Sequence, residues 1–242
     1  EYGNVRCLAL LLKAGADAQY RSQDLPTLGM TALHRAAGPM CRGHGKAECV
    51  RLLLEAGADP HAIEDFGETP LHAATNEGCC LDTIKLLLEA GADPNGVGRA
   101  GVTTPSRIAS FHGDTPLLRA SAACRADCVK ALLKAGALPD FGDNDGYTPL
   151  YVASSYGGAE CVKLLLEAGA DKDRAHGEAC YEDGVYYPIH AASRTNETEC
   201  LKVLLEAGAD ANSVTSVGNT ALHVATKRGH VGCVELLLEA GA

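Results

Sequence analysis

Cysteine is the residue type in this chain with the widest chemical range, since its thiolate can bind zinc, form a disulfide or attack a substrate. The 242 residues include eleven cysteines. Six of them lie eight residues before a recurring glycine, and these are Cys7, Cys49, Cys128, Cys161, Cys200 and Cys233. Thr83 takes the same place before a seventh glycine. The six cysteines therefore mark one position of a repeat and do not form a cluster around one site.

We expect these six thiols to be small buried side chains. Helices in neighbouring layers pack about 8 to 10 Å apart, whereas a disulfide needs Cα atoms within about 7 Å, so equivalent cysteines should not bridge. The other five cysteines fall in turns or loops and should be more exposed: Cys41, Cys79, Cys80, Cys124 and Cys180. Their odd total and the lack of paired Cys-x-x-Cys motifs disfavour a zinc site. Reduced thiols are typical of an intracellular protein, cytoplasmic or nuclear.

Two further patterns suggest ligand chemistry. The stretch 96–101 has the three-glycine spacing of a dinucleotide-binding loop, which normally follows a strand and opens a helix. Here it follows an Ala-Asp-Pro-Asn connector, which favours an inserted surface loop. Asp140, Asp143 and Asp145 resemble part of a calcium loop, but no glutamate closes the pattern. We therefore predict no cofactor and no metal.

Histidines also share one repeat position, occupied by His34, His72, His190 and His223. Leu118 and Tyr151 stand there in two other units. A position that accepts leucine suits packing and not a general base, and no serine or cysteine nucleophile recurs beside it. The sequence thus predicts no catalytic residue and a protein that is not an enzyme.

A hexapeptide, Leu-Leu-Glu/Lys-Ala-Gly-Ala, sets the spacing of all these positions. Its glycines are Gly15, Gly57, Gly91, Gly136, Gly169, Gly208 and Gly241. The gaps between them are 42, 34, 45, 33, 39 and 33 residues, so a unit of about 33 residues recurs with occasional insertions. The chain is a repeat array, in which each layer contacts only its neighbours.

Each full unit carries the signals of two helices. A motif such as Thr69-Pro70-Leu71-His72 precedes the glycine in the same unit, and threonine favours the N-cap while proline suits the first helical position. The second helix, as in 160–168, has an apolar stripe so wide that it must pack between two neighbours before a glycine ends it. Connectors such as 59–68 are rich in aspartate, proline and glycine, which predicts hairpin-like turns.

This order of hairpin, Thr-Pro-Leu-His helix, turn and Leu-Leu-Leu-Glu-Ala-Gly-Ala helix resembles the ankyrin repeat over the whole chain. The resemblance implies an all-α solenoid of stacked helix-turn-helix units with β-hairpin-like connecting loops and a concave face made by the first helices. It also implies histidines that hydrogen-bond within and between repeats, and protein binding in place of catalysis. The units expected are 1–16 (partial), 17–58, 59–92, 93–137, 138–170, 171–209 and 210–242.

Composition narrows the possible partners. A formal charge of −10 disfavours nucleic acid, which requires clustered lysine and arginine. No stretch approaches 18 consecutive apolar residues, so we expect no membrane span in this segment. The recurring acidic residues fit either a solvated face or a surface for a basic partner. Because both ends cut through the repeat pattern, we expect a fragment of a longer chain. We also expect the array to be monomeric.

Insertions into the 33-residue unit are expected to carry recognition, since loops on a rigid frame often do. They lie near 20–29, 38–45, 93–114 and 171–186. The longest combines positive charge with apolar side chains that could dock an acidic partner: Arg99, Arg107, Ile108, Phe111 and His112. A tolerated insertion without a role fits equally well. Tyr181 and Tyr186 are candidates in the last insertion.

The resemblance also implies contacts from the ends of the first helices. Matched to this sequence, those positions are Asn76, Glu77, Ser155, Tyr156, Arg194, Thr195, Lys227 and Arg228. Their chemistry varies between units, as a binding surface or an unconstrained solvent face would. We therefore predict a protein-binding scaffold. The alternative is the regulatory or substrate-recruiting part of a larger enzyme or ubiquitin-ligase adaptor, whose repeats carry a similar Cys-Val-x-Leu-Leu-Leu-Glu-Ala-Gly-Ala pattern.

Overall fold

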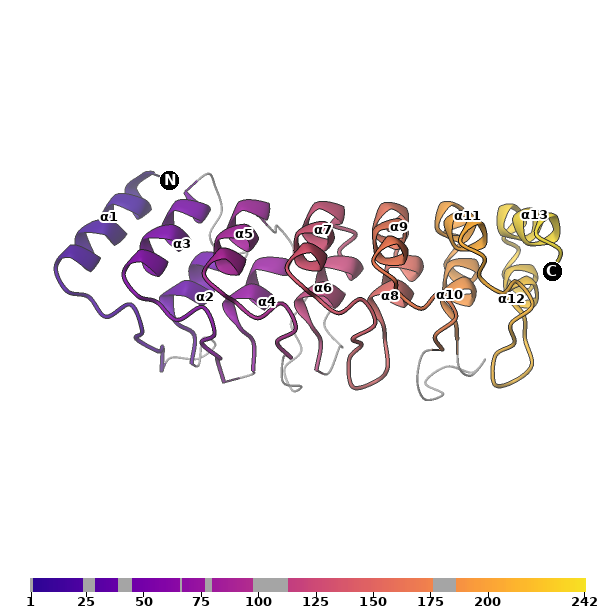
Figure 1. Cartoon of the computed structure of the whole chain (residues 1–242), viewed down its shortest axis with the longest axis horizontal. Helices are drawn as coiled ribbons and strands as arrows, with labels where there is room; N and C mark the ends of the chain where they lie inside the picture. The colour runs from indigo at the N-terminus through magenta and orange to yellow at the C-terminus, as the bar shows by residue number, and fades with distance from the viewer. Residues whose placement is uncertain are drawn as a thin grey trace.

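The computed structural model describes residues 2–23, 29–38, 45–65, 67–76, 80–97, 113–175 and 186–242. It is an elongated stack of helix pairs with the two termini at opposite ends (Figure 1). The described part contains thirteen helices and no strand longer than an isolated bridge, as the predicted all-α solenoid requires. None of the described helices combines the length and apolar character needed to cross a membrane.

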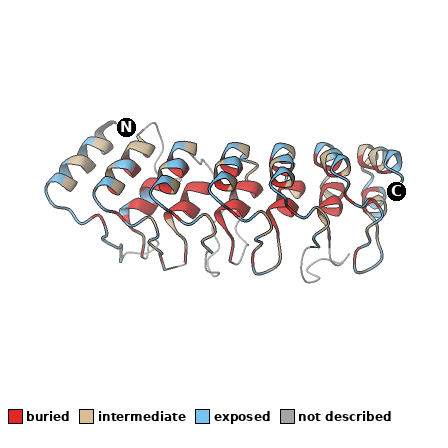
Figure 2. Cartoon of the chain, viewed as in Figure 1, coloured by how far each residue is buried: buried red, intermediate tan, exposed pale blue. Residues whose placement is uncertain are grey.

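The helices alternate between two layers (Figure 1). The second helix of each unit forms one layer: α1 (Tyr2–Lys13), α3 (Lys46–Glu55), α5 (Leu81–Glu89), α7 (Ala126–Lys134), α9 (Ala159–Glu167), α11 (Thr198–Glu206) and α13 (Val231–Glu239). The first helices form the other: α2 (Ala32–Ala37), α4 (Pro70–Thr75), α6 (Pro116–Ala122), α8 (Pro149–Ser155), α10 (Pro188–Thr195) and α12 (Ala221–Arg228). Figure 2 shows the first helices as the more deeply buried layer.

The first helices begin where the Thr-Pro signals predict. The Oγ1 atom of Thr69 accepts a hydrogen bond from the backbone N–H of His72 at 3.4 Å, and that of Thr148 accepts one from Tyr151 at 3.2 Å. Each hydroxyl satisfies an N–H that has no partner inside the helix. Proline follows at the first helical position in both units. The predicted caps are confirmed.

The second helix of an inner unit packs between the second helices of the two neighbouring units. In α9 the side chains of Cys161, Val162 and Leu165 are buried, while Lys163 is exposed. The helix contacts α7 and α11 in the adjacent units and α8 in its own unit. Gly169 then takes a φ of 89°, a left-handed conformation that a residue with a Cβ atom adopts only under strain. The wide apolar stripe is thus used on both sides.

Connectors tie each unit to the next. In the hairpin after α5, the side chain of Asn95 donates to the carbonyl oxygen of Gly136 at 3.1 Å and accepts from the N–H of Leu138 at 2.8 Å. The backbone pairs across two connectors, as isolated bridges between Arg21 and Thr31 and between Val214 and Thr220. The Asn95 side chain thus links one unit to the next, whereas each bridge closes a hairpin within one connector.

Five of the six repeat cysteines are buried as predicted: Cys49, Cys128, Cys161, Cys200 and Cys233. The prediction is wrong for Cys7, which is exposed, because α1 makes its extensive contacts with α3 on one side only. Cys80 and Cys124 are half-buried. The eight cysteines in the described residues carry free thiols. Cys41, Cys79 and Cys180 lie outside the part that the structure describes.

Candidate partner-binding surface

Three successive first helices present their carboxyl ends side by side. Ser155 is the last residue of α8 and Tyr156 its C-cap, Arg194 and Thr195 end α10, and Lys227 and Arg228 end α12. Helix α10 contacts both α8 and α12, so the three ends form one continuous area. We call these six residues the first-helix end surface.

The backbone turns sharply after each of these ends. Asn196 follows α10 with a φ of 64° and Gly229 follows α12 with a φ of 72°, both in the left-handed region. Asparagine and glycine are the residues that enter this region at least cost. The turn carries the chain back toward the second-helix layer (Figure 1).

Exposure differs among the six residues. The Tyr156 side chain is 46% exposed, and Lys227 and Arg228 are also exposed. Ser155, Arg194 and Thr195 are half-buried, and the Thr195 hydroxyl donates to the carbonyl oxygen of Ala191 at 2.9 Å. An exposed aromatic ring next to cationic side chains, on a chain of net charge −10, suits an acidic partner that carries an apolar group.

Tyr186, also predicted to contact a partner, is fully buried. Its ring packs edge-on against the His190 ring with centroids 6.0 Å apart, and the Arg194 guanidinium lies 5.8 Å from its centroid. Cations favour the face of an aromatic ring at this distance. The prediction that Tyr186 lies on the binding surface is therefore wrong, because its ring is buried against the side chains of His190 and Arg194.

Tyr186 belongs to a small apolar cluster that our sequence reasoning missed. Its buried members come from four successive first-helix segments: Leu118, Ala122, Tyr151, Val152, Tyr186, Ala191 and Val224. The signal was present in the sequence, since Tyr147 and Tyr186 both precede the capping position, where the earlier units carry Glu68 and Asp114. The first-helix layer is thus apolar toward the C-terminal half of the chain and charged toward the other half.

The charged half centres on Arg119 of α6, whose side chain is 12% exposed. Its Nη2 atom lies 2.7 Å from Oε1 of Glu68, and its Nε atom donates to Oδ2 of Asp114. Its Nη1 atom donates to Oδ1 of Asn76 at 3.2 Å. Asn76 was predicted to contact a partner, but its carbonyl oxygen is engaged by Arg119, so we exclude it from the surface.

The ion pairs control the charge states in this cluster. Burial disfavours the charged form of Glu68, but the Arg119 guanidinium outweighs burial and holds the pKa of that carboxyl below its ordinary value. Burial likewise opposes the charge on Arg119, yet Asp114 and Glu68 together raise its pKa. Glu68 and Arg119 are therefore both ionised at neutral pH, and their ion pair is a structural support.

Several predicted positions cannot be placed. Glu77, Arg99, Arg107, Ile108, Phe111, His112 and Tyr181 lie outside the described residues.

The aspartates that resembled a calcium loop serve the hairpin after α7. The Oδ1 atom of Asp140 accepts from the N–H of Asp171 at 2.9 Å, and that of Asp143 accepts from Tyr147 at 2.8 Å. No group of three or more metal-ligating side chains within the described residues could hold an ion.

These features define a helical repeat array with a continuous exposed surface. An ankyrin-repeat family model matches it three times, over residues 1–97, 100–176 and 177–242, so the chain belongs to the ankyrin-repeat family. Among solved structures it is similar to the human ASB11 ankyrin repeat domain, at 27% identity and a TM-score of 0.75, covering 100% of this chain and 95% of that one. The search of curated proteins gave no match. Ankyrin repeats are generally protein-interaction domains and typically non-catalytic.

Proposed function

We propose that this ankyrin array is a non-catalytic, intracellular scaffold that holds a partner protein on the first-helix end surface, with further contacts from hairpin tips and inserted loops. The observation that carries the proposal is the contiguity of Tyr156, Arg194 and the pair Lys227 and Arg228 across three adjacent layers. A rigid surface of this kind binds without paying much ordering entropy. The partner segment is acidic with at least one apolar side chain.

Charge reversal combined with loss of the aromatic ring tests this proposal. We expect the triple variant Tyr156→Ala, Lys227→Glu, Arg228→Glu to lose partners that the parent chain enriches in quantitative affinity purification. The variant Lys130→Glu, Lys134→Glu makes the same charge change on α7, where both side chains are exposed on the second-helix layer. If the α7 variant loses the same partners, general electrostatics explains the binding and the surface does not.

A second candidate is substrate recruitment for a ubiquitin ligase. It is supported by the Cys-Val-x-Leu-Leu-Leu-Glu-Ala-Gly-Ala repeats, which resemble those of such adaptors, and the likeness to the human ASB11 ankyrin repeat domain is compatible with it. The recruitment segment would have to lie outside residues 1–242. Co-purification of ligase subunits with the full-length protein, and their loss when only the flanking sequence is removed, would support this role. A catalytic domain in that flank would instead support a regulatory array within an enzyme.

A further inference from the structure

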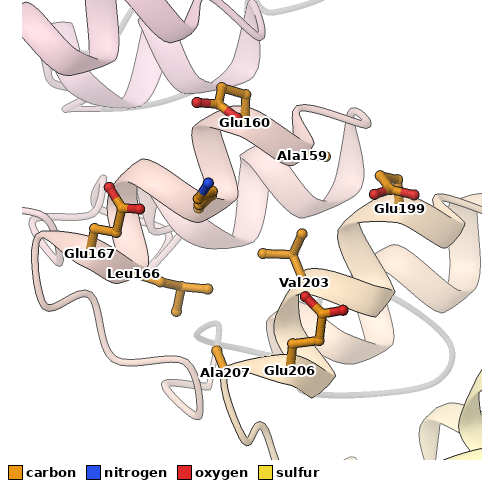
Figure 3. A pocket seen from close by; sticks show the side chains of 9 residues that line it. Ala159, Glu160, Leu166, Glu167, Glu199, Val203, Glu206 and Ala207 are labelled. Atoms are coloured by element: carbon orange, nitrogen blue, oxygen red, sulfur yellow. The ribbon is translucent and has the colours of Figure 1, made fainter.

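A groove of about 670 Å³ runs between α9 and α11 on the second-helix layer, away from the first-helix end surface. Figure 3 shows Glu160 and Glu167 on one helix and Glu199 and Glu206 on the other, with Val203 between them. All four carboxylate side chains are exposed. Lys163 of α9 also lines the groove, so its rim carries four carboxylates and one ammonium group.

The four carboxylates are regularly spaced. Each pair is separated by seven residues, which corresponds to about 10 Å along a helix at 1.5 Å per residue. Neighbouring helices pack about 8 to 10 Å apart. The carboxylates thus stand near the corners of a square with sides of about 10 Å, around a floor that includes Leu166 and Val203.

These carboxylates have no counter-ion among the described residues. The equivalent positions of α3 show the contrast, since Arg51 forms ion pairs with both Glu48 and Glu55 on its own helix. In α9 the corresponding Lys163 makes no ion pair with Glu160 or Glu167 within the described structure. Both helices carry two glutamates and one cation, but the α3 carboxylates are ion-paired with Arg51, whereas those of α9 have no ion pair with Lys163.

Val203 lies on the floor of the groove. At the equivalent position of the second helix, α3, α5, α9 and α13 carry leucine, as at Leu164, whereas α7 carries Ala131 and α11 carries Val203. Valine is one methylene shorter than leucine, so a leucine side chain at position 203 would fill more of the groove floor. Both Val203 and Leu166 are half-buried, so the floor offers apolar surface to an incoming side chain.

We propose that this groove binds a basic protein segment in which an apolar residue lies between two arginines or lysines about 10 Å apart. Three residues in the polyproline II conformation span about 9 Å and return to the same side of the chain, which is close to the spacing of the carboxylates. The apolar side chain packs over Val203 and Leu166, and the cations pair with carboxylates on both helices. Because no set of carboxylates in the described part is close enough to hold a metal ion, a segment with separated charges fits the groove and a single cation does not.

The groove and the first-helix end surface are independent, and they differ in charge. One presents four carboxylates, and the other presents Arg194, Lys227 and Arg228. An array with both can hold an acidic and a basic segment at once, which joins two partners through one rigid body. The groove proposal does not depend on the proposed function, because each surface is tested with its own variants.

A labelled peptide, Gly-Arg-Ser-Leu-Arg-Ser-Gly, tests the groove by fluorescence anisotropy with the whole chain. We expect saturable binding below about 1 mM that weakens as salt rises, and a loss of about tenfold in Glu160→Gln, Glu199→Gln. The matched control Glu48→Gln, Glu55→Gln removes the same charge from α3 and should leave the affinity within about twofold. Equal losses in both variants, or no saturation, would overturn the proposal.

Val203→Leu tests the floor without changing any charge. We expect the added methylene to fill the groove and weaken peptide binding about fivefold, while the circular dichroism melt stays close to that of the parent, as expected for a residue found at this position in α9. Lys163→Gln removes the opposing cation and should tighten binding. Unchanged affinity in Val203→Leu, or displacement of the peptide by millimolar calcium, would contradict the proposed mode. Tyr156→Ala should not alter peptide binding, so the two surfaces can fail separately.

Discussion

The Nε2 atom of His72 lies 3.2 Å from the carbonyl oxygen of Asp114, 42 residues later in the chain. A carbonyl oxygen only accepts, so Nε2 carries the proton and donates it across the layer boundary. The Nδ1 atom then accepts from the backbone N–H of Thr69 at 3.2 Å and from its hydroxyl at 2.8 Å. His34 makes the same bridge to the carbonyl oxygen of Glu68 at 3.0 Å. The structural role implied for these histidines is confirmed.

A neutral histidine is required by this geometry, because a proton on Nδ1 would face the Thr69 N–H. Burial lowers the pKa of His72 to about 4 and, with the same leading cause, that of His190 to about 4. The unfolded chain therefore binds more protons between about pH 6.5 and pH 4. We predict that the free energy of unfolding falls as the pH is lowered through this window, by up to about 3 kcal/mol for His72 alone.

His72→Leu isolates this contribution, since Leu118 already occupies the position in the next unit. At pH 7 we expect a loss of about 1 to 3 kcal/mol, because the Asp114 carbonyl and the Thr69 cap lose their partner. Urea unfolding at pH 7 and pH 4.5 should show a smaller pH dependence in the variant than in the parent. An unchanged pH dependence would mean that His72 does not carry the effect.

Arg119→Met is predicted to destabilise the array by about 3 kcal/mol, measured by urea unfolding at pH 7. It leaves Glu68 and Asp114 as buried carboxylates without a counter-ion, and removal of one partner of a buried pair is costly. The matched control is Arg51→Met, whose side chain is 45% exposed and also pairs with two glutamates. Solvent and salt screen that pair, so the midpoint should move little. Similar losses in both variants would show that the Arg119 cluster is not buried in solution.

Asp143→Thr is predicted to stabilise the chain at pH 7 by about 1 kcal/mol. Burial raises the pKa of Asp143 to about 6 from an ordinary value near 3.8, and its buried Oδ2 atom has no hydrogen-bond partner. The folded state therefore binds more protons between about pH 4 and pH 6, and stability contributed by this group falls as pH rises. The gain in the variant should be largest at pH 7 and disappear near pH 4.

The replacement is taken from the same chain. Thr215 occupies the equivalent hairpin position, is 3% exposed, and accepts from the N–H of Asn219 at 3.1 Å without a charge. Threonine at 143 can therefore keep the turn contact to the Tyr147 N–H. The reciprocal variant Thr215→Asp should lose stability at pH 7 and recover part of it at pH 5. If thermal unfolding of both variants matches the parent, Asp143 is solvated in solution.

The sequence predicted well those features that are determined by a residue's position within the repeat unit. The Thr69 cap and the burial of Cys161 recur in several units, so the spacing alone indicated where these side chains point. The bridging role of His72 was implied by the resemblance to the ankyrin repeat. Periodicity reports the direction of the Cβ atom on a helix. It could therefore predict the layers, their caps and their apolar faces.

The sequence analysis missed features that are determined by contacts with side chains of neighbouring units. Asn76 and Tyr186 occupy positions expected at the surface, but Arg119 reaches Asn76 from 43 residues away and Tyr186 lies in an apolar cluster formed by four units. The groove beside Val203 is lined by residues of two neighbouring units. These features need the neighbouring layer to be known, because a side chain is covered by whatever the adjacent unit presents.

The reactivity of each cysteine thiol should depend on how far the neighbouring units bury it, and the rate of alkylation tests this. Burial raises the pKa of Cys161 to about 12 and that of Cys200 to about 12, so both are protonated thiols without solvent access and should resist iodoacetamide at pH 8. Among the cysteines that the structure describes, Cys7 is exposed and should react first, and half-buried Cys124 should react more slowly because burial raises its pKa. Peptide mapping by mass spectrometry over time would show the order. Modification of Cys161 as fast as Cys7 in the folded chain would mean that the layers around α9 open readily, since the closed stack leaves its sulfur no path to solvent.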